Sequence, residues 1–149
     1  MRAVLQVDVE QEDNVQEAAE NDAVQVGTDV YLRAQPIELH QTQVANLQAM
    51  CAADHLAPTG QAGHWQREFQ LHRAAIADRL TLELGESALA PSRSMAQEFA
   101  EKLVAWDRAN ESSVGPVPAA DPRWDANAVG YVRQEFAADL DAKSRPLFD

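Results

Sequence analysis

The strongest constraint on the fold is a stripe of mostly apolar residues that begins just after Pro36. Its members recur at spacings of three and four residues: Ile37, His40, Val44, Leu47, Cys51 and His55. At about 100° per residue, these positions fall on one side of a helix. Proline is favoured at the start of a helix, and Pro58 and Gly60 follow the stripe. The pattern predicts an amphipathic helix over residues 37–56.

Three later segments show the same helical spacing, over about residues 64–84, 94–110 and 125–141. Gly85 is the expected C-cap of the first segment, and Ser94 opens the second in capping-box spacing. The first of these segments carries two apolar stripes that lie roughly 100° apart around the helix. We therefore expect that helix to contact neighbours on two sides.

The first 35 residues differ, because apolar and polar residues alternate over residues 4–9. A period of two is typical of a half-buried strand. A second extended region surrounds a turn at 27–29 and predicts a hairpin of strands 23–26 and 30–34. The acidic residues 10–22 between these regions form either a short helix or a loop.

Together the patterns predict an α+β fold that is mostly α, with an N-terminal strand pair or small sheet followed by about four amphipathic helices. The chain has 149 residues, the common size of one domain. We expect a single domain over residues 1–149. It comprises a strand-rich acidic part at 1–35, a helical part at 36–143 and a tail at 144–149.

The net charge of −12 is concentrated near the N-terminus, where residues 1–30 hold eight acids and a single base. Negative charge of this kind repels nucleic-acid phosphates and anionic lipid headgroups. We therefore expect neither direct nucleic-acid binding nor docking on a membrane surface.

Cys51 is the single cysteine, so no intramolecular disulfide can form and a reducing compartment fits best. Asp8 interrupts the N-terminus before an apolar signal segment can develop, and no stretch approaches the length of a transmembrane helix. The expected location is the cytoplasm, or a particle assembled inside the cell, with no signal peptide.

A metal site is the sharpest chemical hypothesis, because Cys51 and His55 stand four residues apart and His64 and His72 follow. His64 and His72 are about 12 Å apart along a helix, too far to share one ion easily. No CxxC or HExxH spacing supports a site. We therefore interpret Cys51, His55, His40 and His72 as core positions, and keep Cys51, His55 and His64 as metal candidates.

Catalytic motifs are absent: the chain has no GxSxG, P-loop or dinucleotide fingerprint. Asp139 and Asp141 are two residues apart and would point away from each other on a helix. The three tryptophans fit core positions. We expect a protein that is not an enzyme and needs no cofactor.

The function that remains is a non-enzymatic structural or adaptor subunit, binding other protein subunits in a larger assembly. A virus or phage particle component, or its assembly factor, is one setting. The alternatives are an acidic inhibitor that occupies a basic or nucleic-acid-binding groove, and a small metal-dependent or cysteine enzyme. The expected partner-binding residues are acids near the N-terminus and apolar residues of the tail: Glu10, Glu12, Asp13, Glu17, Leu147 and Phe148.

Overall fold

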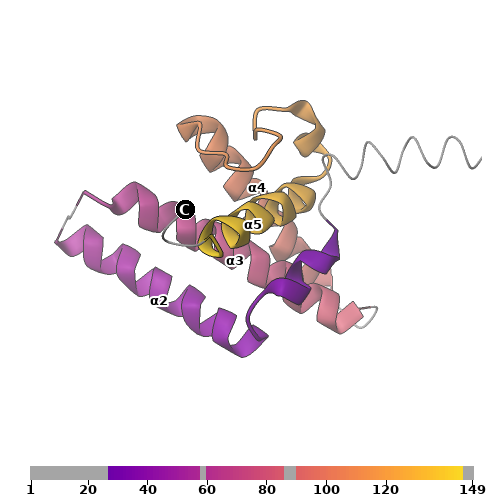
Figure 1. Cartoon of the computed structure of the whole chain (residues 1–149), viewed down its shortest axis with the longest axis horizontal. Coiled ribbons are helices and arrows are strands. Elements are labelled where there is room, and N and C mark those ends of the chain that lie inside the picture. Colours follow the sequence, from indigo (N-terminus) through magenta and orange to yellow (C-terminus); the bar gives the residue numbers. More distant parts are fainter. Residues whose placement is uncertain (1–26, 58–59, 86–89, 146–149) are drawn as a thin grey trace, which may run out of the picture.

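A computed structural model describes residues 27–57, 60–85 and 90–145 of the chain (Figure 1). Within these residues the backbone forms α-helices and two short 3-10 helices. The α-helices are α2 (Ile37–Leu56), α3 (Ala62–Leu84), α4 (Ala90–Asn110) and α5 (Ala128–Lys143). The 3-10 helices are η1 (Thr28–Arg33) and η3 (Pro122–Asp125).

The predicted α+β class is wrong, because the described residues contain helices and no strand. The proposed second hairpin strand at 30–34 lies largely within η1. A strand would place Val30 and Leu32 on one face, whereas Val30 is 4% exposed and Leu32 is 84% exposed. The predicted strands at 4–9 and 23–26 and the acidic segment 10–22 lie outside the described residues.

The helix predictions after Pro36 are confirmed. The predicted 37–56 segment has the bounds of α2, and Gly85 caps α3 with a φ of 56°, a left-handed conformation that glycine adopts easily. The helix predicted to begin at Ser94 starts one turn earlier, at Ala90.

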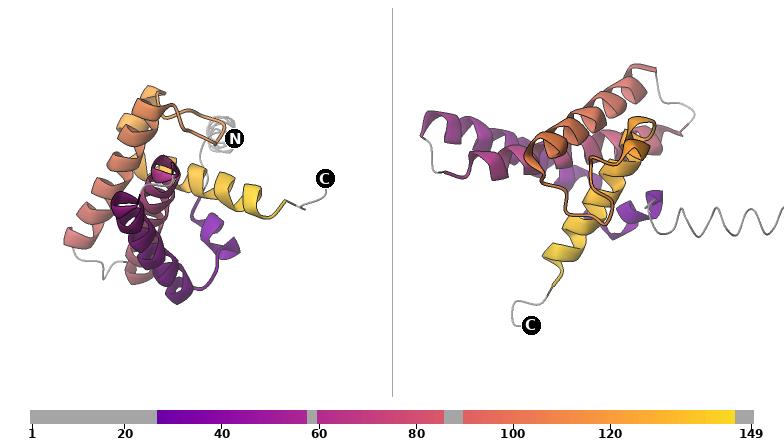
Figure 2. Two further views of the ribbon diagram at one scale, coloured as in Figure 1. Left: turned by 90° about the vertical axis from the view of Figure 1, so that its left-hand side faces the viewer. Right: turned by 90° about the horizontal axis from the view of Figure 1, so that it is seen from above.

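α3 is the central helix, since it packs against α2, α4 and α5, as its two apolar stripes predict (Figure 2). The core lies where α3, α4, α5 and η3 meet. Its fully buried side chains include Leu71, Leu103, Trp124, Tyr131 and Val132.

α2 lies at the edge of the molecule and packs mainly against α3 (Figure 1). Its buried residues are His40, Leu47 and Asp54, which share one side of the helix. α2 therefore packs mainly on α3, and near its start the His40 ring also stacks on Phe136 of α5, with ring centroids 5.4 Å apart.

α5 begins at a side-chain cap, because Asn127 Oδ1 accepts a hydrogen bond from the Gly130 backbone N–H at 3.1 Å. Such a cap satisfies a backbone donor that has no partner inside the helix. We expect Asn127→Ala to lower the free energy of unfolding by about 1 kcal/mol. Urea denaturation measures this loss, and Asn127→Asp is the control that should retain most of the stability.

Candidate functional site

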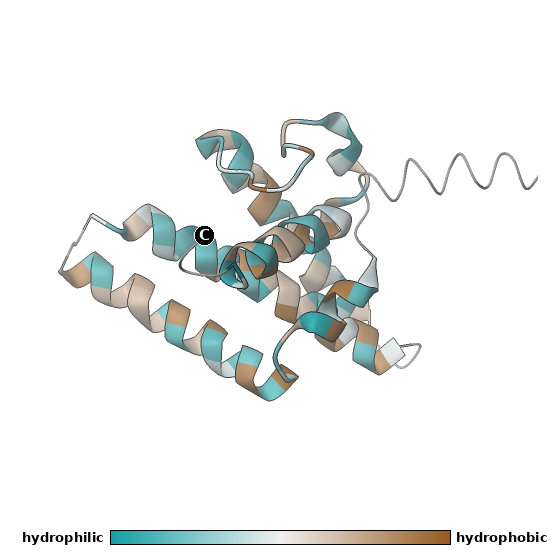
Figure 3. Ribbon diagram, viewed as in Figure 1, coloured by the Kyte–Doolittle hydropathy of each residue, from teal (hydrophilic) through white to brown (hydrophobic). Residues whose placement is uncertain are grey.

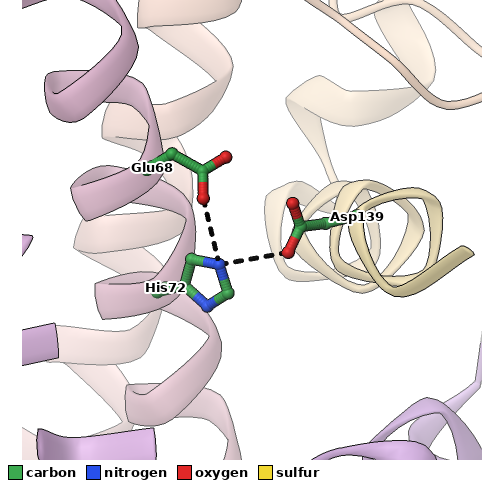
Figure 4. A group of neighbouring side chains, drawn as sticks. All are labelled: Glu68, His72 and Asp139. Carbon is green, nitrogen blue, oxygen red and sulfur yellow. Dashed lines mark ion pairs between the residues drawn. The ribbon is translucent and has the colours of Figure 1, made fainter. Parts of the chain in front are cut away.

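α3 and α5 bring one histidine and two carboxylates together (Figure 4). Glu68 and His72 lie one turn apart on α3, and Asp139 faces them from α5. His72 Nε2 is 3.1 Å from Asp139 Oδ2 and 3.6 Å from Glu68 Oε2. Ligand-type atoms of all three residues lie within 4.8 Å of one another. We call Glu68, His72 and Asp139 the His72 cluster.

The His72 cluster is largely shielded from solvent, with side-chain exposures of 15% for Glu68, 4% for His72 and 12% for Asp139. His72 Nε2 is buried, and neither carboxylate contact has the geometry of a hydrogen bond. Lys143 Nζ lies 3.1 Å from Glu68 Oε2 and 2.8 Å from Asp139 Oδ2, on a side chain that is 52% exposed. The ammonium therefore balances the carboxylates from the solvent side.

The charges in the cluster stabilise one another. Burial alone would raise the pKa of Asp139, but the contacts with His72 and Lys143 outweigh it and lower that pKa. Burial would lower the pKa of His72, and the contacts with Asp139 and Glu68 outweigh it and raise that pKa. The geometry thus favours positive charge between the two carboxylates.

A chain of polar contacts reaches the cluster from α2. Arg79 NH1 lies 3.0 Å from His40 Nδ1, and His40 Nε2 lies 3.1 Å from His72 Nδ1. A guanidinium only donates hydrogen bonds, so His40 Nδ1 accepts and His40 Nε2 donates to His72 Nδ1. Burial, with the nearby charges of His72 and Arg79, lowers the pKa of His40 to about 3. A neutral His72 then carries its proton on Nε2, facing the carboxylates.

A second buried group of charges joins α3, α4 and α5. Arg67 donates from Nε and NH2 to the two oxygens of Asp107 at 2.9 and 2.8 Å, and from NH2 to Glu135 Oε1 at 2.7 Å. Ser112 and Tyr131 also donate to Asp107, at 2.6 and 2.5 Å. We call these five residues the Arg67 network.

The Arg67 network also fixes the loop before η3. Glu135 accepts hydrogen bonds from the backbone N–H groups of Val114 and Gly115 at 2.7 and 2.8 Å. Both carboxylates of the network have fully buried side chains, and Arg67 is 13% exposed. Every carboxylate charge here meets several donors, which is the arrangement that a structural charge network requires.

A cavity of about 430 Å³ opens beside this network, lined by Gly63, His64, Arg67, Glu68, Trp106, Asn110, Ser112 and Val114. Glu68 belongs both to the wall of this cavity and to the His72 cluster. The Arg67 guanidinium is already engaged by Asp107 and Glu135. The cavity wall therefore holds one carboxylate that faces a candidate metal position.

The residues proposed from sequence as metal ligands lie elsewhere. Cys51 and His55 line a hollow of about 290 Å³ between α2 and α3, together with Asp54. His64 stacks edge-on against Trp65 and lines the larger cavity. Among the described residues, the group of three whose ligand atoms converge is the His72 cluster instead.

Cys51 lacks the setting of a reactive thiolate. Burial and the charge of Asp54 raise the pKa of the Cys51 thiol. Activated cysteines need a lowered pKa, supplied by positive charge or a helix N-terminus. The structure gives the proposed cysteine chemistry no support at this position.

The residues proposed as partner contacts from sequence are outside the described part of the chain. They are the N-terminal acids and the two apolar residues of the tail: Glu10, Glu12, Asp13, Glu17, Leu147 and Phe148.

The exposed side of α2 is a different candidate for partner contact. Ten exposed positions of α2 lie within an arc of about 160° that borders the buried stripe at Leu39 and Met50 and extends to the opposite side of the helix. We call them the α2 outer face: Glu38, Leu39, Thr42, Ala45, Asn46, Ala49, Met50, Ala52, Ala53 and Leu56. The exposed Gln41, Gln48 and His55 lie beyond the other edge of this arc. Apolar segments recur along this helix at the edge of the molecule (Figure 3).

Sequence reasoning missed the His72 cluster as a unit. The spacing of Glu68 and His72, four residues apart, places them on one helix face and was the available signal. Asp139 is 67 residues beyond His72 in the sequence, and no local pattern connects them.

Within the described residues, no helix combines the length and apolar character needed to cross a bilayer. No protein-family model matches the chain, and neither the curated proteins nor the solved structures include a match.

Proposed function

We propose that the protein is a non-enzymatic adaptor that binds another protein through the α2 outer face. The observation that carries the proposal is the chemistry of this face: Glu38 is its one charged residue. Its large apolar side chains are exposed by 56% at Leu39, 41% at Met50 and 84% at Leu56. A surface helix ordinarily presents charged and polar residues to solvent.

The face can supply useful binding energy. Burying a Leu or Met side chain contributes about 1.5–3 kcal/mol, before the cost of association is subtracted. Four alanines between the large residues allow a partner helix to approach closely. Met50 and Ala53 also line a hollow of about 320 Å³ with Trp65, which can receive a side chain from the partner. These features support contact with a protein rather than with a small polar ligand.

The charge of the chain indicates the chemistry of the partner. No Lys or Arg occurs between Arg33 and Arg67, and the whole chain carries a net charge of −12. A second copy would bring the same negative charge. The occupant that fits is a different protein, with an apolar helix face bordered by Lys and Arg, since complementary charge speeds association and selects the partner. A virus or phage particle, or its assembly machinery, stays the proposed setting.

A designed amphipathic peptide tests the proposal. The probe is a helical peptide with leucines on one face and lysines beside them, labelled for fluorescence anisotropy. We expect salt-sensitive binding to the full chain, weakened about tenfold by Leu39→Ser with Met50→Ser. Each side chain is only about half exposed, so the two together remove about 1.5–3 kcal/mol of apolar burial. The matched control is Leu32→Ser with Val114→Ser, at residues that are exposed by 84% and 61% and are not part of the α2 outer face.

Two results would overturn this proposal. One is equal loss of peptide binding in the α2 variant and the control variant, or no binding by any of them. The other is a homodimer in light scattering that the α2 variant abolishes, because a second copy would then occupy the face.

A further inference from the structure

We propose that the His72 cluster is a Zn²⁺ site that fastens α3 to α5, with His72 Nε2 and one oxygen each from Glu68 and Asp139 as protein ligands. The proposal is independent of the adaptor role of α2. One imidazole and two carboxylates match the ligand types of zinc, whereas Mg²⁺ and Ca²⁺ favour all-oxygen sites.

The distances in the cluster suit a tetrahedral ion. With zinc–ligand bonds of about 2.0–2.2 Å, neighbouring ligand atoms are separated by about 3.3–3.6 Å. His72 Nε2 is 3.1 Å from the Asp139 oxygen and 3.6 Å from the Glu68 oxygen. Small side-chain rotations are therefore sufficient to place three ligands around one ion, with a fourth position open to water.

A second observation points to a ligand at this place. His72 is 3% exposed, and its Nε2 atom has no hydrogen-bond partner. Buried polar atoms in proteins nearly always have one, so each exception needs an explanation. Here the nitrogen forms ion-pair contacts with two largely buried carboxylates but no hydrogen bond to either of them (Figure 4). A cation bound by all three groups accounts for the arrangement.

When no metal is bound, the Lys143 ammonium is the cation that contacts both carboxylates. Lys143 bridges the same two carboxylate oxygens that zinc would use. It is the last residue of α5, on a half-exposed side chain, so it can swing into solvent without disturbing the helix. Zinc binding thus exchanges one cation for another.

Zinc binding would shift the proton on His40 and disrupt the contact between His40 and Arg79. Zinc on His72 Nε2 requires the proton on Nδ1, which then donates to His40 Nε2, and metal-bound histidines ordinarily make such an outer hydrogen bond. The proton of His40 moves to Nδ1, where it meets the Arg79 guanidinium at 3.0 Å. Two donors cannot share that position. Arg79 must therefore withdraw, and it opposes metal binding.

Isothermal titration of Zn²⁺ into the full chain, freed of metal by chelation, tests the site. We expect one ion per chain and at least about tenfold weaker binding in Glu68→Gln and in Asp139→Asn, because even outer-shell changes cost this much. Asp141→Asn is the matched control, two residues away on the same helix and paired with Arg33 at the surface. Its affinity should equal that of the unaltered protein.

Variants that bind zinc more tightly than the unaltered chain give a test that misfolding cannot explain, because a misfolded chain would lose affinity. Lys143→Met removes the competing cation, and we expect about two- to fivefold tighter zinc binding, the worth of an exposed ion pair. Arg79→Gln should also tighten binding, because the amide oxygen can accept the proton on His40 Nδ1. Cobalt as a substitute ion should give the visible absorption of a tetrahedral site, and Asp139→Asn should abolish it.

The proposal is overturned if the unaltered chain takes up no zinc, or if Asp139→Asn and Asp141→Asn bind it equally. It is also overturned if Cys51→Ala with His55→Ala removes binding while Glu68→Gln retains it, since the ion would then occupy the hollow between α2 and α3. Weaker binding in Lys143→Met would show that the lysine supports the ion instead of competing with it, and would likewise contradict the exchange of cations.

Discussion

Replacing Arg67 by Met is expected to lower the free energy of unfolding at pH 7 by about 3–5 kcal/mol, the cost of leaving a buried charge without its partner. Arg67 donates to both Asp107 and Glu135, whose side chains are fully buried. Met has a similar length and fills the same space without donating. Two carboxylates therefore lose their counter-ion at once, and urea denaturation measures the effect.

The same substitution at Arg33 provides the control. Arg33 pairs with Asp141 at the surface, where the two side chains are 50% and 60% exposed. Solvent screens such a pair, so Arg33→Met should cost no more than about 1 kcal/mol. Equal losses in the two variants would show that the Arg67 network contributes nothing beyond an ordinary surface ion pair.

The pH dependence of the Arg67 variant follows from Asp107. Burial would raise the pKa of Asp107, but hydrogen bonds from Arg67, Ser112 and Tyr131 outweigh it and lower that pKa in the intact protein. This stabilisation is present above the pKa of the unfolded chain and is lost as the pH falls through the lower folded pKa. Without Arg67, the effect of burial on the pKa of Asp107 is less strongly opposed. Protonation of Asp107 then removes a buried charge that destabilises the variant. The difference in the free energy of unfolding between the intact protein and Arg67→Met should therefore shrink as the pH falls from 7 towards 5.

Replacing Trp124 by Ala is expected to cost about 3–5 kcal/mol, the range for large aromatic residues in a core. Trp124 is 1% exposed, packs edge-on against Tyr131 with ring centroids 5.3 Å apart, and donates from Nε1 to the Pro118 carbonyl at 3.1 Å. The substitution leaves a cavity and removes the anchor of the loop before α5.

Trp106→Ala is the matched control for this prediction. Trp106 is half-buried and lines the 430 Å³ cavity, so its loss enlarges a space that already exists and should cost less. Thermal unfolding of both variants, followed by circular dichroism, compares them. A loss below about 1 kcal/mol for Trp124→Ala would mean that η3 and its loop are not part of the cooperative core.

The helices after Pro36 could be predicted from the residue pattern, because the signals that begin and end them are local. Apolar spacing, Pro36 and Pro58 predict the bounds of α2, and Gly85 marks the end of α3. The strand prediction failed at Val30 and Leu32 because two apolar residues two positions apart fit a strand and a 3-10 turn equally well. Packing against the helical core decided between them, burying Val30 and leaving Leu32 exposed.

The candidate sites, in contrast, depend on how distant helices pack and could not be predicted from local spacing. The spacing of Glu68 and His72 shows that they share a helix face, but Asp139 joins them because α5 packs across α3. Likewise, the pattern of α2 identifies its buried stripe, while the exposure of Leu39 and Met50 depends on α2 lying at the edge of the molecule and packing mainly on α3. Periodicity reports which side of a helix is apolar. It carries no information about which distant element covers that side, because that choice depends on how all the helices pack together.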